Sequence, residues 1–159
     1  MQRIPTSHNS RSRLPSLGSA YLCWATLALV MAVGLSACPL VSFYDPTSYQ
    51  RATDLKAESL MLIAKATDPP AAHAAQIDAL RLKLSQAYEY ERGKGKPNLT
   101  TVEQWKLLND PDGALLGGFL KKWQTDNAGQ SAAFVSGMSS NVGKAFDQII
   151  KLDSAKVKN

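Results

Sequence analysis

The sequence predicts an all-α protein, a small helical bundle that follows a cleaved signal segment. Apolar residues recur every three or four positions along four stretches of residues 46–159, which is typical of helices that bury one face. No stretch shows the alternation of a strand, and prolines and glycines separate the four stretches. Four helices running up, down, up and down are the simplest arrangement. A repeat solenoid is not expected, because no self-similarity recurs at its period.

The first helix is expected to begin at Pro46, with Asp45 as its N-cap, since proline suits the first helical position. It should end at about Lys65 or Ala66, before the prolines of residues 69–70. A broad apolar face predicts an interior helix. Its members are Leu55, Leu60, Leu62, Ile63 and Ala66.

The second helix is expected from about Ala71 to Arg92, where the stretch RGKGKPN supplies glycines and a proline that end it. Its apolar face repeats at three and four positions, and a second stripe runs beside it. The face contains Ile77, Leu80, Leu84, Ala87 and Tyr88, and the stripe contains Ala75, Ala79 and Leu82.

The third helix is expected to begin at Thr100, where TTVE has the pattern of a capping box. It should break at residues 109–111, with Asp110 capping its second part. Gly113 and Gly117 have a spacing that favours two closely packed backbones, although a docking groove is an alternative. The second part supplies the apolar residues Leu115, Leu116, Phe119, Leu120 and Trp123, and we expect Trp105 and Trp123 in the core.

The fourth helix is expected from about Ser131, with apolar residues separated by gaps of three and four, the spacing of a bundle seam. The seam should face Leu80, Leu84 and the first helix. It contains Val135, Met138, Val142, Ala145, Ile149 and Leu152.

The N-terminus has the pattern of an export signal. Residues 1–20 contain Arg3, Arg11 and Arg13 and no acidic residue, and a largely apolar run covers residues 21–35. As a helix this run would be about 22 Å long, short of the roughly 30 Å of a hydrocarbon core. A secretory signal peptide is therefore favoured over an uncut membrane anchor.

The end of this run, Leu35-Ser36-Ala37-Cys38, resembles the lipobox of bacterial lipoproteins. The resemblance implies cleavage before Cys38 and acylation of its thiol. It divides the chain into a signal peptide at 1–37, a lipidated tether at 38–45 and a helical bundle at 46–159. It also implies a membrane partner, bound through the N-terminal lipid, and a domain that faces the periplasm. Pro39 replaces the aspartate that favours inner-membrane retention, so the outer membrane is favoured over the inner.

The chain after the signal contains few groups that could bind a metal or a nucleic acid. The signal holds three of the 18 basic residues and none of the 13 acidic ones, which leaves a net charge of +2 and no reason to expect a nucleic-acid partner. Cys23 leaves with the signal and Cys38 carries lipid, so no thiol remains. One histidine, His73, stays, and we interpret it as an exposed helix residue. No metal or cofactor is expected.

No catalytic motif is apparent, so we do not expect an enzyme. Glu89 and Glu91 are the nearest pair of carboxylates, but their spacing on a helix points them apart. We interpret them as a solvated face with Arg92. The alternatives are an envelope enzyme or small-ligand binder with a site built from scattered polar residues, and a lipoprotein related to toxins or phage.

Basic residues follow the second and fourth expected helices. In an up-down bundle, Arg92, Lys94 and Lys96 would lie beside Lys151, Lys156, Lys158 and residue 45, at the lipid end. They are the candidates for contact with anionic lipid or an acidic partner, unless they only keep the domain soluble. The function expected from the sequence is a lipid-anchored periplasmic interaction module: a scaffold, adaptor or accessory subunit with a protein partner in the envelope.

Overall fold

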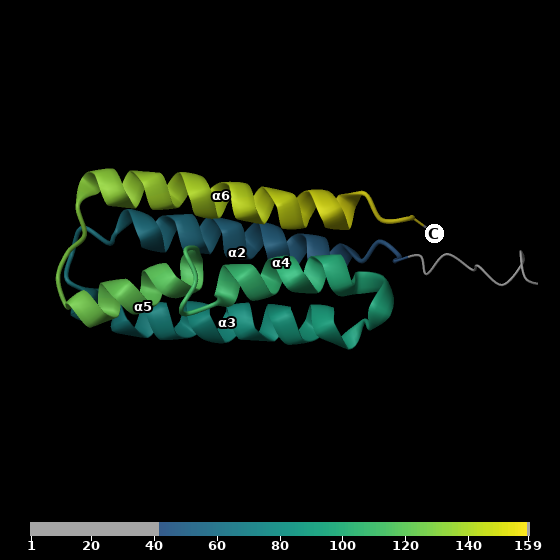
Figure 1. Cartoon of the computed structure of the whole chain (residues 1–159), viewed down its shortest axis with the longest axis horizontal. Helices are drawn as coiled ribbons and strands as arrows, with labels where there is room; N and C mark the ends of the chain where they lie inside the picture. Colours follow the sequence, from purple (N-terminus) through teal and green to yellow (C-terminus); the bar gives the residue numbers. More distant parts are fainter. Residues whose placement is uncertain (1–41, 159) are drawn as a thin grey trace, which may run out of the picture. The chain divides into compact units, whose positions relative to one another are not determined.

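A computed structural model describes residues 42–158 (Figure 1). The signal segment and the residues Leu35, Ser36, Ala37 and Cys38 lie outside the described residues. Within them the protein is all-helical, which confirms the predicted fold class. The β pairing found in this part of the chain is one isolated parallel bridge between Phe43 and Val157. No helix of residues 42–158 is both long and apolar enough to cross a membrane.

Five α-helices form the described domain, where four were expected. They are α2 (Pro46–Ala64), α3 (Ala74–Gly93), α4 (Leu99–Asn109), α5 (Leu116–Asp126) and α6 (Ala132–Ser154). Short 3₁₀ turns, η1 (Pro70–His73) and η2 (Lys96–Asn98), precede α3 and α4. The predicted break after Asn109 is thus confirmed, and it is wide enough to give two separate helices.

Local capping explains two of the helix starts. The Asp45 carboxylate accepts the Thr47 backbone N–H at 2.9 Å, with Pro46 next in the chain. The Ser131 hydroxyl accepts the Phe134 N–H at 3.3 Å at the start of α6. The predicted N-cap Asp45 and the predicted start of the fourth helix near Ser131 are confirmed, and in both caps the donor and acceptor lie within three residues of each other.

The predicted capping of the third helix is wrong. Helix α4 starts at Leu99, so Thr100 and Thr101 lie inside it, and Thr101 is buried. Asp110 does not cap α5 either: its side chain accepts the Asp112 N–H at 2.9 Å and closes a turn between the two helices. Leu115 occupies the N-cap position of α5, without a side-chain hydrogen bond.

The helices lie side by side along the long axis of the domain (Figure 1). Helix α2 packs against α6 and α3, and α4 packs against α3 and α6. Helices α4 and α5 follow one another along the same side of the domain. Helix α6 packs against α2, the first helix, as expected, and also against α4. Leu80 and Leu84 of α3 belong to the same core.

One apolar core runs through the bundle. Trp105 and Trp123 are fully buried in it, as predicted. In the α6 seam Ala145 and Leu152 are only half-buried, and Phe146 is fully buried beside them. The buried members of the seam are Val135, Met138, Val142 and Ile149. The second stripe predicted on α3 is exposed, and Leu82 lies 61% open to solvent.

Gly117 lets the start of α5 approach the end of α4. A Cβ at Gly117 would lie 2.2 Å from the carbonyl oxygen of Asn109, far inside van der Waals contact. This confirms close backbone packing at Gly117. Gly137 on α6 differs, because a Cβ there would meet nothing within 4 Å.

We therefore expect opposite effects from alanine at these two glycines. Gly117→Ala should lower the free energy of unfolding by about 1–3 kcal/mol, because the methyl group has no space beside Asn109. Gly137→Ala should raise it by about 0.5–1 kcal/mol, because alanine favours an exposed helix interior. Urea denaturation of both variants measures the difference. Equal effects would contradict the close approach of the two backbones.

Candidate functional site

Three segments far apart in sequence meet at one end of the bundle (Figure 1). The Tyr44 N–H donates to the Val157 carbonyl at 2.8 Å, and the Lys94 ammonium lies 2.9 Å from the Asp45 carboxylate. We call this end, formed by residues 42–45, 90–99 and 153–158, the tether end. The expectation that residue 45, the 92–96 loop and the C-terminal tail lie together is confirmed.

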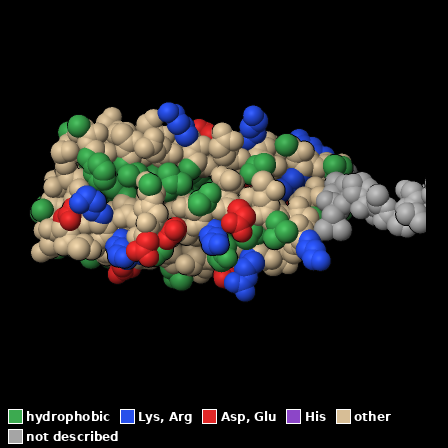
Figure 2. Space-filling model, viewed as in Figure 1, with side chains coloured by type: hydrophobic (Ala, Val, Ile, Leu, Met, Phe, Trp, Pro, Cys, Tyr) green, Lys and Arg blue, Asp and Glu red, His purple; other side chains and the backbone are tan. Residues whose placement is uncertain are grey.

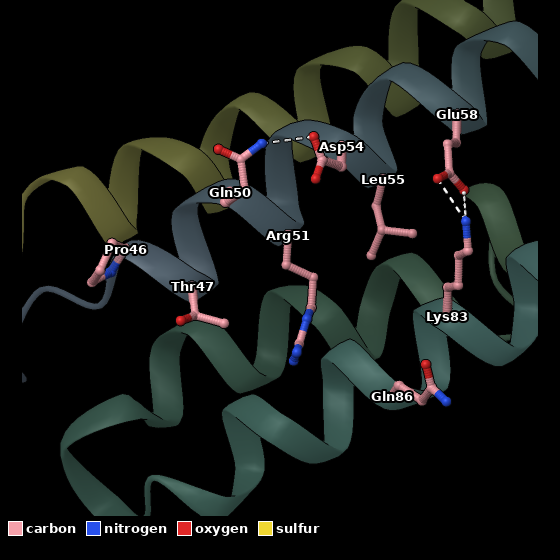
Figure 3. Close-up of a pocket in the computed structure, with 9 residues that line it drawn as sticks. All are labelled: Pro46, Thr47, Gln50, Arg51, Asp54, Leu55, Glu58, Lys83 and Gln86. Carbon is pink, nitrogen blue, oxygen red and sulfur yellow. Dashed lines mark hydrogen bonds and ion pairs between the residues drawn. The ribbon is translucent and has the colours of Figure 1, made fainter.

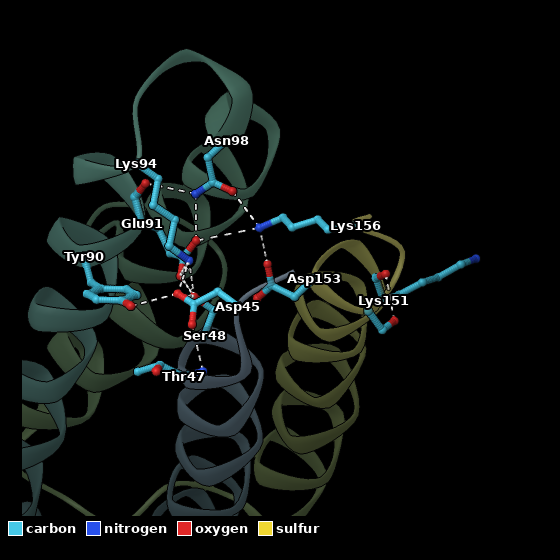
Figure 4. A network of polar contacts seen from close by, with 11 residues as sticks. Asp45, Thr47, Ser48, Tyr90, Glu91, Lys94, Asn98, Lys151, Asp153 and Lys156 are labelled. Carbon is cyan, nitrogen blue, oxygen red and sulfur yellow. Dashed lines mark hydrogen bonds and ion pairs between the residues drawn. The ribbon is translucent and has the colours of Figure 1, made fainter. Parts of the chain in front are cut away.

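A network of polar side chains closes the tether end (Figure 4). Asp45 begins it: one carboxylate oxygen accepts the Tyr90 hydroxyl at 2.7 Å and lies 2.9 Å from Lys94 Nζ. The Tyr90 ring lies beneath two cations, with the Arg51 guanidinium 4.3 Å and the Lys94 ammonium 4.8 Å from its centre. The N-cap of α2 is thereby joined to the end of α3.

Glu91 is the centre of the network and is only 2% exposed. The Asn98 amide donates to its carboxylate at 2.7 Å and to its backbone carbonyl at 2.9 Å. Lys94 lies 2.9 Å from its other carboxylate oxygen, which also accepts the Ser48 hydroxyl. Helix α2, the end of α3 and η2 are thus held by one buried carboxylate.

Lys156 brings the C-terminal tail into the same network. Its ammonium pairs with Asp153, donates to the side-chain amide oxygen of Asn98 at 2.6 Å and lies 3.9 Å from Glu91. Asp153 is fully buried, and its second carboxylate oxygen has no partner among the described residues.

The network shifts the pKa values of two of its carboxyl groups, Asp45 and Asp153, in opposite directions. Burial alone would raise the pKa of Asp45, but hydrogen bonds from Lys94, Tyr90 and the Thr47 N–H outweigh it and hold the pKa well below its ordinary value. Burial raises the pKa of Asp153, and its pairing with Lys156 only partly opposes this. The pKa of Lys94 is raised because its bonds to Asp45 and Glu91 exceed the cost of burial.

The basic residues singled out from the sequence fall into two groups. Lys94 and Lys156 point into the network, and their side chains are only 23% and 7% exposed. Arg92, Lys96 and Lys158 stay at the surface. Arg92 pairs with Glu89 at 3.1 Å, and the Lys158 ammonium lies 5.3 Å from the centre of the Tyr44 ring.

Sequence reasoning missed the centre of this site. The interpretation of Glu89 as a solvated partner of Arg92 is confirmed, but the same interpretation of Glu91 is wrong. The available signal was position: Glu91 follows Leu84 and Ala87 at the helical spacing of the buried face of α3. A carboxylate at such a position requires cations from elsewhere in the fold.

His73 is also not the exposed helix residue expected from the sequence. It lies in η1 with a side chain only 14% exposed, and its ring nitrogen lies 3.1 Å from the Asp68 carboxylate. Its ring packs against Trp123 at a centre-to-centre distance of 5.8 Å. These contacts indicate a structural role for His73 in the turn between α2 and α3.

A shallow groove of about 620 Å³ runs between α2 and α3 (Figure 3). Its charged groups are largely engaged with each other, since Lys83 pairs with Glu58 at 2.7 Å and Gln50 donates to Asp54 at 2.8 Å. Within residues 42–158, no cluster of three or more histidine, cysteine, aspartate or glutamate side chains could hold a metal ion. The carboxylates of the tether end are each paired with lysine.

Comparison of the chain with protein-family models, curated proteins and solved structures gives no match.

The depressed pKa of Asp45 predicts how stability depends on pH. Because the unfolded-state pKa is higher, about 4, its contribution is present above that pH and is lost as the pH falls through the folded-state value. Asp45→Asn keeps the N-cap and removes the charge, so it should cost about 1 kcal/mol at pH 7 and progressively less below pH 4. Urea denaturation across this pH range measures the effect.

Asp54→Asn is the matched control, because Asp54 is exposed and accepts a hydrogen bond from Gln50 alone among the described residues. It should change the free energy of unfolding by less than about 0.5 kcal/mol at either pH. A pH-independent loss in Asp45→Asn would contradict the ionic role of Asp45.

Proposed function

We propose that this protein is a lipid-anchored helical interaction module of the bacterial cell envelope, a scaffold, adaptor or accessory subunit that faces the periplasm. One observation carries the proposal: residues 42–45, the first part of the described chain, lie at the end closed by the network around Glu91. A chain anchored by its N-terminus would present this end to the membrane and the opposite end to partners. Pro39 favours the outer membrane as the site of anchoring.

The proposed topology is a four-helix bundle that runs up, down, up and down. In this description α4 and α5 together count as the third helix, interrupted by the turn that Asp110 closes. Support comes from their consecutive placement along the same side of the domain (Figure 1). This topology would put the turns at 65–70 and 127–131 at the end away from the membrane.

Those two turns form the surface that we propose for a protein partner. The Gln130 N–H donates to the Ala66 carbonyl at 2.7 Å, and the Trp123 indole N–H donates to the Asp68 carbonyl at 3.0 Å. A Cβ at Gly129 would lie 2.0 Å from the Thr67 carbonyl oxygen, so glycine permits their contact. A preordered surface of this kind lowers the entropic cost of binding a protein. No nucleic-acid partner is proposed.

The groove between α2 and α3 favours a second candidate function, a small-ligand-binding or enzymatic lipoprotein. Its lining contains both charged and apolar side chains, among them Arg51, Leu55 and Lys83 (Figure 3). The groove is open, however, and most binding sites for small molecules bury the greater part of the ligand. The interaction module is therefore the preferred proposal.

Anchoring through Cys38 is tested by fractionation of cells that express the chain. The wild-type protein should fractionate with membranes, and globomycin, which blocks the lipoprotein peptidase, should cause the longer precursor to accumulate. Cys38→Ser should abolish acylation and change processing. Unchanged processing and membrane fractionation of Cys38→Ser would overturn the lipid anchor and leave an uncut membrane segment as the explanation.

The partner-facing end is tested by site-specific photocrosslinking in intact envelopes. A crosslinker at Ala128, which is exposed in the 127–131 turn, should give discrete adducts with another envelope protein. The control places the same group at Met61, which is 66% exposed on the flank of α2 and should give few adducts. Equal adducts from both positions would contradict the assignment of the partner surface.

A further inference from the structure

We propose that the tether end docks directly onto an anionic phospholipid surface. The docking face consists of three exposed apolar residues, Phe43, Leu99 and Val157, and two exposed lysines, Lys96 and Lys158. The inference rests on the proposed function, because membrane anchoring through the N-terminal segment places this end beside the bilayer. It adds a second contact, made by the folded domain itself.

Three large apolar side chains at this end are more than half exposed. Phe43, Leu99 and Val157 are 56%, 57% and 51% exposed. The β bridge joins Phe43 to Val157, and Leu99 follows Asn98, which accepts a hydrogen bond from Lys156. Single exposed apolar residues are ordinary on protein surfaces, but three that come from separate segments and meet at one end are suited to the lipid boundary.

The network leaves the surface of this end positively charged. Three carboxylates lie at the tether end, and Lys94 and Lys156 balance all but one of them inside the structure. Lys96 and Lys158 are exposed and have no carboxylate partner among the described residues. On the face shown in Figure 2, basic and hydrophobic side chains occupy the end nearest residue 42, whereas acidic side chains lie farther along the bundle.

The length of the tether keeps this face close to the bilayer. Residue 42 lies four residues after Cys38, a span of at most about 14 Å. If the apolar run ending at residue 35 stayed in the membrane instead, the span would be about 25 Å. Either length allows the docking face to reach the headgroups, where charge and apolar contact act, so an anionic bilayer is the occupant that this end fits.

The initial rate of lysine acetylation measures the contact in the protein without a mutation. The full chain is reconstituted into protein-free vesicles of phosphatidylcholine alone or of phosphatidylcholine mixed with phosphatidylglycerol, and acetylation rates are followed by mass spectrometry. Lys96 and Lys158 should react about fivefold more slowly on the anionic vesicles, the factor expected for a lysine at a charged leaflet, and salt should remove the protection. Lys65, exposed at the opposite end, and Lys144, exposed on α6, should react equally on both.

Charge reversal provides the matched variants. In Lys96→Glu, the protection of Lys158 on anionic vesicles should be lost; in Lys65→Glu, which changes the net charge equally, it should remain. Equal rates for Lys96 and Lys158 on both vesicles would overturn the inference. Protection found only in native envelopes, and not in protein-free vesicles, would also overturn it and assign the face to a protein.

These outcomes separate the inference from the lipid anchor. Reconstitution holds the chain on the vesicle through either the Cys38 lipid or the uncut apolar run, so lysine protection reports on docking in both cases. Failure of Cys38 acylation with lysine protection intact would overturn only the anchor. Acylation without lysine protection would overturn only the docking face, and a chain that binds neither vesicle would overturn both.

Discussion

The buried carboxylate of Glu91 is the constraint on which the tether end depends. A charge at 2% exposure is tolerable only if cations and hydrogen-bond donors surround it, and here they come from α2, η2, the end of α3 and the C-terminal tail. Lys94 and Asn98, both close to Glu91 in sequence, bind its two carboxylate oxygens, and Ser48 and Lys156 extend the network to α2 and the C-terminal tail. Glu91 therefore links the two described ends of the chain.

This internal pairing also shapes the outer surface. Lys94 and Lys156 form ion pairs with carboxylates, so they contribute little to the electrostatic potential at the surface. Lys96 and Lys158 remain exposed to solvent. The same arrangement places Phe43 beside Val157 at the end where the N-terminal segment enters. The polar network that closes the bundle thus leaves exposed the mixed apolar and cationic face that we propose for lipid contact.

The opposite end is held mainly by backbone contacts, beside the pairing of His73 with Asp68. Gly129 permits a close approach to the carbonyl oxygen of Thr67 at that end, and Gly117, at the α4–α5 break along the bundle, permits one to the carbonyl oxygen of Asn109. The α4–α5 break relies on this approach, and the turns at the far end are joined by hydrogen bonds to Ala66 and Asp68. The contrast between the two ends supports different partners: lipid at one and protein at the other.

The sequence by itself determined the helical class, the N-cap Asp45, the start of the last helix near Ser131, the break after Asn109 and most of the buried face of α6. These features depend on interactions within a few residues and on a short apolar period, both readable along the chain. Tertiary structure decided the start of α4 and the burial of Glu91. Asn98 precedes α4 with its side chain bound to Glu91 and Lys156, so the local TTVE pattern could not reveal where the helix begins. Which lysines remained exposed was likewise decided by carboxylates distant in sequence, because only the folded chain brings those charges within bonding distance.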